Sequence, residues 1–284
     1  MVNQKKDITA IIVLYNVTEV ILECLDNLND TKIIIADNGD NDPNIIEKIK
    51  KKANIIKYFK FKKNIGFGRA CNFCLRHVKT KFTLLIEPDV FIKEKDLIYL
   101  KESFSKYSEA GILVPTLINE NDDIIDELHN LPELNISNQN QTNNYFNGDT
   151  CVHFCWAAVL LLNTDLIKKV GLFNKKIFIF WEDFYLCRKL KEKKIQIIKI
   201  YNSRAFHKEN ASTKKTIKTK FILYKHHILS SYIYFNVNKK DVLLKKKFFI
   251  YLFRVISYFL ILNLEKSLKN FGRLCATITY LNQK

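Results

Sequence analysis

The fold class of this chain is decided by a continuous apolar run at residues 8–14, which reads Ile-Thr-Ala-Ile-Ile-Val-Leu. β-branched residues dominate the run, and polar residues do not alternate with apolar ones along it. This pattern is typical of a strand that is buried on both faces within a parallel sheet. Helical periodicity follows over residues 18–28, so the chain opens with a strand and then a helix.

Three further strands are predicted along the first third of the chain, at residues 32–36, 55–61 and 82–86. Between them, Pro43 stands where a first-turn proline would open a helix, and residues 69–77 have helical spacing. Strands that alternate with helices in this way predict an α/β fold. We expect a mixed, mainly parallel sheet that is flanked by helices.

Polar turns follow the predicted strands at Asp37, at Asn64 and at Glu87-Pro88-Asp89. Because the carboxyl ends of parallel strands meet at one edge of a sheet, we expect these side chains to face a common ligand site. Carboxylate oxygens such as those of Glu87 and Asp89 suit Mg or Mn that bridges a diphosphate. The alternative for these two acids is a simple capped turn, and their place after the fourth strand favours the metal.

The second half of this domain begins with a polar, Asn-rich stretch at residues 119–150, which indicates a long loop. The expected elements then follow in this order: a strand at 156–162, a helix at 164–170, a helix from Glu182 to about residue 194, a strand at 196–200 and a loop that carries His207.

Glu182 and Asp183 follow an aromatic cluster that would exclude water and lower the local dielectric constant. An acid there serves either as a helix cap or as a general base with a raised pKa, and two adjacent acids can divide these roles. The His207 imidazole could complete a metal shell that Asp89 begins, although a lone His is more often a surface or packing residue.

The order of these motifs resembles family 2 glycosyltransferases, and within them most closely the rhamnosyltransferase-like branch. The resemblance covers residues 8–212 and implies a GT-A fold, a nucleotide-sugar donor and an inverting mechanism. It is carried by six motifs in the family's order: Leu14-Tyr15-Asn16, Ala36-Asp37-Asn38-Gly39, Asn64-Ile65-Gly66-Phe67-Gly68, Glu87-Pro88-Asp89, Gly171-Leu172-Phe173 with Trp181-Glu182-Asp183-Phe184, and His207 with Ser212.

The resemblance also implies a set of residues that bind the donor. Asp37 would accept a hydrogen bond from the pyrimidine imide, with Tyr15, Asn16 and Asn64 near the base and the ribose. Arg69 would face the diphosphate. These positions are those expected of a dTDP- or UDP-sugar donor.

Catalytic and metal-binding roles follow from the same resemblance. Asp89 and His207 would hold the divalent metal, Mg or Mn, and Glu87 would assist directly or through water. Asp183 would take the proton from the acceptor hydroxyl, and Glu182 would orient the acceptor or the base. The implied function is transfer of a hexose, with rhamnose or another deoxyhexose as the candidate, to a surface-glycan or lipid-linked acceptor such as a lipopolysaccharide precursor.

Residues 214–284 differ in character from the catalytic domain expected at residues 1–213. The chain of 284 residues carries 46 Lys and Arg against 29 Asp and Glu, a formal charge of +17, and basic residues cluster near its C-terminus among aromatic ones. Such a field attracts polyanions. We expect amphipathic helices at 221–235, 242–262 and 264–281 that associate with a membrane.

The apolar run at residues 248–262 carries Arg254 and is shorter than the ~20 residues that a membrane span needs. We therefore expect it to lie on a bilayer or against the domain. With no targeting segment evident, the expected location is the cytoplasm, peripheral on the cytoplasmic face of the inner membrane. The alternatives are a basic nucleic-acid-binding protein and a non-catalytic nucleotide-sugar-binding protein, which joint retention of Asp89, Asp183 and His207 disfavours.

Seven cysteines, an odd number, are spread through the predicted helices and strands. Free thiols in a reducing cytoplasm fit this distribution. A zinc site remains the alternative, and it is disfavoured because the residues around the paired cysteines predict helix and strand rather than a knuckle. The four residues in question are Cys71, Cys74, Cys151 and Cys155.

Overall fold

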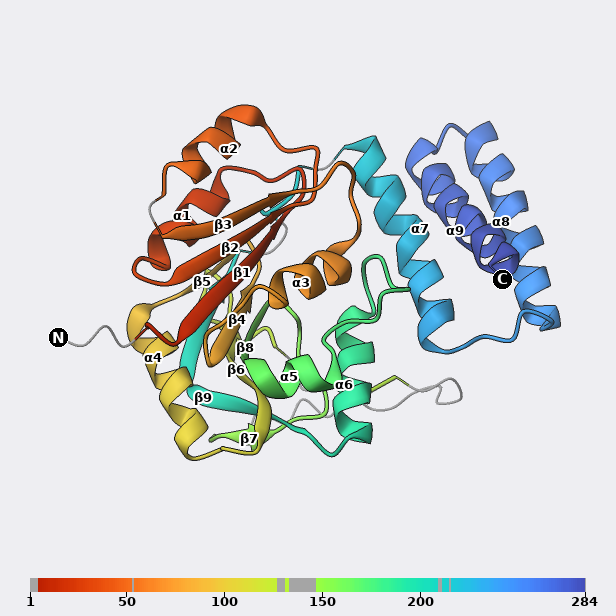
Figure 1. Ribbon diagram of the computed structural model, residues 1–284. Helices are drawn as coiled ribbons and strands as arrows, with labels where there is room; N and C mark the ends of the chain where they lie inside the picture. The colour runs from red at the N-terminus through yellow and green to blue at the C-terminus, as the bar shows by residue number, and fades with distance from the viewer. Residues whose placement is uncertain are drawn as a thin grey trace. The chain divides into compact units, whose positions relative to one another are not determined.

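The computed structural model describes residues 5–52, 54–126, 131–132, 147–208, 211–214 and 216–283 (Figure 1). The chain forms two compact units. The first comprises Met1–Phe173 and Asp183–Lys214, and the second comprises Asn174–Glu182 and Lys215–Lys284.

The first unit is built on one nine-stranded sheet with the order β3-β2-β1-β4-β8-β6-β9-β5, in which β7 also pairs with β9. Its first four strands in this order are parallel, whereas β8 and β5 run antiparallel to their neighbours. The predicted mixed, mainly parallel sheet is therefore confirmed. The strands are β1 (Ile8–Leu14), β2 (Lys32–Asp37), β3 (Ile55–Lys60), β4 (Phe82–Ile86), β5 (Val90–Ile92), β6 (Ala110–Ile118), β7 (Thr150–Cys151), β8 (Val159–Asn163) and β9 (Gln196–His207).

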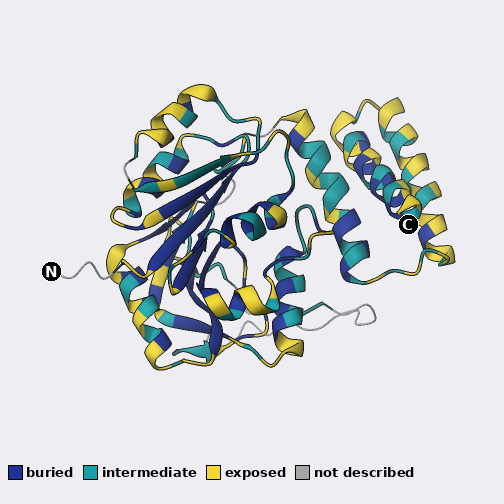
Figure 2. Ribbon diagram, viewed as in Figure 1, coloured by how far each residue is buried: buried dark blue, intermediate teal, exposed yellow. Residues whose placement is uncertain are grey.

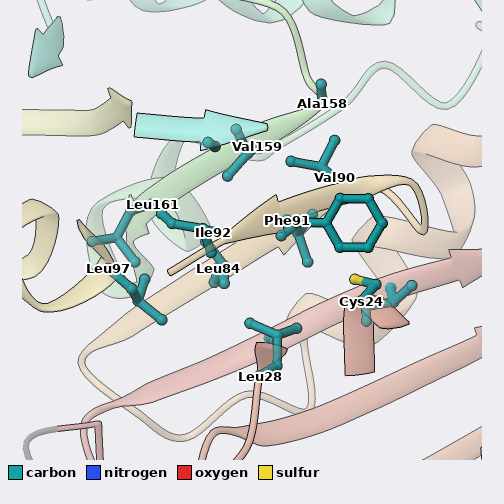
Figure 3. Packing of buried hydrophobic residues seen from close by; sticks show 14 of the residues in the cluster. Cys24, Leu28, Leu84, Val90, Phe91, Ile92, Leu97, Ala158, Val159 and Leu161 are labelled. Atoms are coloured by element: carbon teal, nitrogen blue, oxygen red, sulfur yellow. The ribbon is translucent and has the colours of Figure 1, made fainter. Parts of the chain in front are cut away.

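Helices cover both faces of this sheet, so its central strands are apolar throughout. Ile12 of β1 packs into a core cluster with Ile21 and Leu25 from one side, and Ile11 packs with Cys71 from the other. Figure 3 shows part of the first cluster, where Cys24 and Leu28 lie near residues of β4 and β5. The helices of this unit are α1 (Val20–Asn27), α2 (Pro43–Lys50), α3 (Phe67–Leu75), α4 (Glu94–Glu102), the short 3-10 helix η1 (Ser103–Ser105), α5 (Thr164–Val170) and α6 (Glu182–Glu192).

The end of β9 differs from the prediction. The strand does not stop at residue 200 but continues to His207, which therefore ends a strand instead of lying in a loop. Polar residues hid this continuation, because their hydrogen bonds are made inside the fold. Ser203 is fully buried and donates from its Oγ to the Asp96 carbonyl at 3.0 Å, and the Arg204 N–H donates to Asp96 Oδ1 at 3.1 Å.

Smaller differences from the prediction concern the middle of the chain. The strand predicted from Trp156 begins at Val159, and β5, β6, β7 and α4 were not predicted. In the loop predicted at residues 119–150, Ile124 forms an isolated antiparallel bridge with Ile118 of β6. Residues 127–130 and 133–146 of this loop lie outside the described residues. The seven cysteines are free thiols, with Cys71 and Cys74 buried and Cys151 exposed.

The second unit contains the three predicted C-terminal helices, α7 (Ile217–Tyr234), α8 (Val242–Leu260) and α9 (Leu264–Asn282). Residues 174–182 pack onto α7, where the Phe178 ring stacks on His226 with centroids 4.3 Å apart. Gly272 allows α9 to approach α7, because a Cβ there would lie 2.8 Å from the Cβ of Tyr224. In the part of the chain that the structure describes, no helix has the length and apolar character needed to cross a membrane.

Candidate active site

Asp89 is the most firmly held acid of the site. It is 1% exposed, and its Oδ2 accepts hydrogen bonds from the backbone N–H groups of Ala211 at 3.2 Å and Ser212 at 2.9 Å. The Lys208 N–H donates to the Asp89 carbonyl at 2.9 Å. The segment after β9 thus holds the carboxylate in one orientation and leaves Oδ1 facing another way.

Asp89 Oδ1 is buried and has no hydrogen-bond partner among the described residues. It lies 3.8 Å from His207 Nε2, which is also 3.8 Å from Glu87 Oε2. One ligand atom from each of these residues lies within 4.8 Å of the other two. Two ligands bound about 2.1 Å from one ion are roughly 3–4 Å apart, so the two 3.8 Å separations suit a Mg²⁺- or Mn²⁺-sized ion, and three ligands leave other coordination positions open.

The sheet brings these residues together because β4 ends immediately before Glu87 and β5 begins immediately after Asp89. The turn is closed by a hydrogen bond from the Val90 N–H to the Glu87 carbonyl at 3.2 Å. β5 then pairs with β9 in a register that places Val90 opposite His207. The imidazole therefore reaches the acids through strand pairing, which no spacing in the sequence reveals.

Glu87 has a pKa raised to about 8. Burial of the carboxylate is the largest cause, followed by the negative charges of Asp89 and Asp183. The side chain still exposes 36% of its surface, so the crowding of acids and the enclosed setting act together on a group that a ligand can reach. Like charges close together favour the protonated form of one of them, or a bound cation.

The affinity of the site for Mg²⁺ or Mn²⁺ is expected to rise with pH. Below the Glu87 pKa of about 8, a proton occupies the carboxylate and must leave before the group can bind a cation. The affinity should increase by up to about tenfold per pH unit towards pH 8 and level off above it. Calorimetry in buffers of different ionisation enthalpy would measure the released proton.

Glu87→Gln is the control for this titration, because it keeps the side-chain shape and replaces the titratable carboxyl group with a neutral amide. The variant should bind the cation more weakly and with a shallower pH dependence. An affinity of the unmodified protein that stays constant up to pH 8 would contradict the assignment of Glu87 to the cation site.

Asp183 is the second residue of α6 and acts electrostatically on Glu87. Burial raises the Asp183 pKa to about 6, while hydrogen bonding from the backbone N–H of Phe184, 2.8 Å from Oδ1, opposes the increase. Such a carboxylate is ionised at neutral pH and is a stronger base than an exposed Asp. Beside it, Phe184 stacks on Phe154 with centroids 4.3 Å apart, and Phe154 contacts the partly exposed Trp156.

Asp37 ends β2 and is 2% exposed. Its carboxylate accepts hydrogen bonds from the Gly39 N–H at 3.1 Å, from Asn41 Nδ2 at 2.6 Å and from the Tyr58 hydroxyl at 2.6 Å. Burial and the hydrogen bond to Asp37 raise the pKa of Tyr58. A carboxylate has about four acceptor positions, so these contacts orient Asp37 and leave room for about one more donor.

Asn38 connects the turn after β2 to the turn after β3. Its Nδ2 donates to Asn64 Oδ1 at 2.8 Å, and its Oδ1 accepts from the Ile65 N–H at 2.9 Å. An open pocket of 290 Å³ lies beside this edge and is lined by Asp37, Gly39, Asp40, Asn41, Pro43, Ile46, Glu47, Lys50 and Lys60. Its volume is close to the roughly 300 Å³ of the smallest ligand pockets.

The turn at Tyr15 and Asn16 is tied to the segment that holds Asp89. Asn16 Nδ2 donates to the Lys214 carbonyl at 3.0 Å, and the Lys214 N–H donates to the Asn16 carbonyl at 3.0 Å. The Thr18 N–H donates to the Ser212 carbonyl at 3.1 Å. Residues 15–18 and 211–214 therefore form one polar layer, and the Tyr15 hydroxyl reaches Asp40 Oδ2 at 3.3 Å.

The structure thus brings together Glu87, Asp89 and His207 as one cluster and joins Asp37 to Asn64 through Asn38. Arg69 is exposed as the third residue of α3. Glu182 is 8% exposed at the start of α6, where the boundary between the two units separates it from Asp183. The expected roles of Arg69 and Glu182 stay predictions.

Sequence reasoning missed several residues that support the site. Asn38 stands inside a recognised motif, so its position could have signalled a role in binding. Tyr58 could not be linked to Asp37 from the sequence, because it comes from a different strand. The register pairs Asp37 with Lys60, and Tyr58 lies on the same face two residues earlier. The backbone amides at residues 211 and 212 carry no side-chain signal at all.

Known proteins share features of this chain in sequence and in fold. The model of the family described as glycosyl transferase family 2 matches residues 9–171. The search of curated proteins finds no significant match.

Among solved structures, GalNAc-T7 with UDP, GalNAc and Mn²⁺ matches with a TM-score of 0.56 and 12% identity over 70% of this chain. The mannosyltransferase PcManGT from Pyrobaculum calidifontis, in complex with GDP-Man and Mn²⁺, matches with a TM-score of 0.53 and 12% identity. This match covers 96% of this chain and 73% of PcManGT. S. aureus TarS matches with a TM-score of 0.56 and 13% identity over 96% of this chain. This chain spans 42% of GalNAc-T7 and 55% of TarS. At these identities the likeness shows the fold alone.

Proposed function

Because the chain belongs to glycosyl transferase family 2, we propose that it transfers a sugar from a nucleoside-diphosphate donor to an acceptor hydroxyl with inversion at the anomeric carbon. The observation that carries this proposal is the cluster of Glu87, Asp89 and His207. Asp183 lies within electrostatic reach of Glu87. A cation site and a buried base at one sheet edge are what a single displacement on an activated sugar needs.

In the proposed reaction, Asp183 accepts the proton of the acceptor hydroxyl while that oxygen forms a bond to the anomeric carbon. The bond from this carbon to the phosphate oxygen breaks, and the electron pair leaves with the nucleoside diphosphate. A divalent cation held by Asp89 and His207, with help from Glu87, would stabilise the charge on that leaving group. Glu182 is proposed to orient the acceptor or the base.

The donor side of the proposal concerns the base and the sugar. The remaining acceptor position of Asp37 matches the single imide N–H of a pyrimidine, which favours a UDP- or dTDP-sugar. Tyr15, Asn16 and Asn64 would contact the base and ribose, and Arg69 the diphosphate. We further propose rhamnose or another deoxyhexose as the transferred sugar, and a surface-glycan or lipid-linked acceptor at the cytoplasmic face of the inner membrane.

A thermal-shift screen of nucleoside diphosphates and nucleotide sugars, with and without Mn²⁺ or Mg²⁺, tests the proposal. UDP or dTDP with the cation is expected to raise the unfolding temperature by about 5 °C when present at about one hundred times its dissociation constant. Either component alone should give a smaller shift, because the diphosphate and the cation bind each other in the site. If no nucleotide stabilises the protein under any condition, the proposed activity is wrong.

A further inference from the structure

Helix α8 has an inward face that packs in the second unit. Leu244, Phe248, Tyr251 and Val255 follow the spacing of one helix face, and these residues are buried or half-buried. Leu244 belongs to a core cluster with Tyr232 of α7 and Ala276 of α9. This face meets the expectation for an amphipathic helix, whose opposite face is ordinarily polar.

The outward face of α8 is apolar as well. Phe249, Phe253, Ile256 and Leu260 repeat the same spacing on the other side, and they are 66%, 71%, 52% and 74% exposed. Figure 2 shows α8 almost entirely in the colours of exposed and intermediate residues. A contiguous apolar patch on a protein surface usually marks an interaction site, so the outward face of α8 calls for a partner.

The exposed surface continues into the turn between α8 and α9. Phe259, next to the last residue of α8, is 61% exposed, Leu262 in the turn is 81% exposed, and Leu264 opens α9 at 61%. The outward residues form one strip, here named the α8 apolar face, which consists of Phe249, Phe253, Ile256, Phe259, Leu260 and Leu262.

Positive charge surrounds this strip. Helix α8 contains Lys245, Lys246, Lys247 and Arg254 but no acidic residue. Lys245 and Lys246 are exposed beside the N-terminal end of the α8 apolar face, whereas the Lys247 ammonium lies over the Tyr232 ring, 5.5 Å from its centroid. Residues 214–284 hold fifteen Lys and Arg and two acidic residues, so they supply +13 of the chain's +17. The partner must therefore be apolar at its centre and negative at its margin.

We propose that the α8 apolar face docks onto a lipid bilayer that contains anionic lipids, with the helix lying in the interface and Lys245 and Lys246 against the headgroup phosphates. A large apolar strip combined with basic residues is the composition of interfacial helices. Nucleic acid would satisfy the charge but not the phenylalanine and leucine side chains. A second copy of the chain would satisfy the apolar strip but would bring two strongly positive units together.

The docking face stands independently of the reaction. The further idea that docking brings the protein to a lipid-linked acceptor rests on the proposed function. Insertion of the side chains from Phe249 to Leu262 would hold the protein at the membrane surface without a membrane-spanning helix.

Vesicle flotation of the full chain tests the proposal, with vesicles of phosphatidylcholine alone and of phosphatidylcholine mixed with phosphatidylglycerol. The unmodified protein is expected to float with the anionic vesicles. Phe253→Ser with Leu262→Ser should weaken this partitioning about 100-fold, because each large apolar side chain contributes about tenfold or more. Lys245→Gln with Lys246→Gln should weaken it about thirtyfold and only on anionic vesicles.

Matched controls remove the same groups elsewhere. Ile56→Ser with Ile217→Ser replaces two large side chains that are 50% and 76% exposed outside α8. Lys79→Gln with Lys95→Gln removes two charges from exposed positions in the first unit. Both control proteins should bind anionic vesicles as the unmodified protein does.

Failure of the membrane proposal is separable from failure of the proposed function. If the protein does not float, or if the two α8 variants float like their controls, the docking face is wrong. A dimer in solution that Phe253→Ser with Leu262→Ser converts to a monomer would assign the face to a second copy instead. Thermal shift measures nucleotide binding in the same proteins, and this binding should be unchanged in every variant. It reports only on the first unit, so it tests the proposed function separately.

Discussion

Asp183→Asn is expected to reduce sugar transfer by about 10³-fold, because a positioned general base contributes roughly 10²–10⁴-fold and the amide cannot accept the proton of the acceptor hydroxyl. The substitution preserves the local structure. The amide oxygen can still accept the hydrogen bond from the Phe184 N–H, which lies 2.8 Å from Asp183 Oδ1. Nucleotide binding should therefore change little, and transfer measured at saturating donor shows the loss.

The pH profile of the unmodified enzyme gives an independent check on Asp183. Its pKa of about 6 means that the base becomes protonated as the pH falls through about 6, so activity at saturating cation should decline on the acidic side and hold at neutral pH. Asp165→Asn, at an exposed position of α5, is the matched control and should transfer normally. Full activity of Asp183→Asn would exclude this residue as the base.

Asp89→Asn is expected to weaken Mn²⁺ or Mg²⁺ binding about 100-fold or more and to lower transfer by at least the same factor. The reason is the geometry around the carboxylate. Oδ2 accepts hydrogen bonds from the backbone N–H groups of Ala211 and Ser212, and the amide oxygen of the substituted Asn side chain can still accept them. The charge on the buried Oδ1, 3.8 Å from His207 Nε2, is lost.

A second readout separates loss of the cation from loss of the fold. The thermal shift caused by UDP or dTDP with Mn²⁺ should disappear in Asp89→Asn, while its unfolding temperature without ligands stays near that of the unmodified protein. Asp26→Asn, which removes an exposed acid from α1, should behave as the unmodified protein does. Undiminished cation binding by Asp89→Asn would show that the acid cluster holds no metal.

The sequence was sufficient to predict the four strands that lie side by side as β3-β2-β1-β4 in the sheet, and the polar turn that follows β4. The apolar run at residues 8–14 is β1, and residues 82–86 form β4 as predicted. Pro43 opens α2, where the Asp42 side chain accepts from the Asn44 N–H. These features depend on local periodicity and capping, which a sequence displays directly. The polar turn at Glu87 to Asp89 followed from the end of its strand.

Long-range pairing decided the rest. His207 joins the acids because β9 continues past polar residues that Asp96 satisfies, and because β5 pairs with its end. Tyr58 supports Asp37 only through the register of β2 and β3. Such contacts depend on which strands become neighbours.

The α8 apolar face shows the same division between sequence and structure. Its sequence displays aromatic, aliphatic and basic residues on every side of the helix, and this composition by itself leaves open which of them pack inside the unit. Packing against α7 and α9 buries Leu244 and leaves Phe253 71% exposed. Local patterns determine where helices and strands form, because they depend on neighbouring residues. Burial and the convergence of distant side chains depend on tertiary packing.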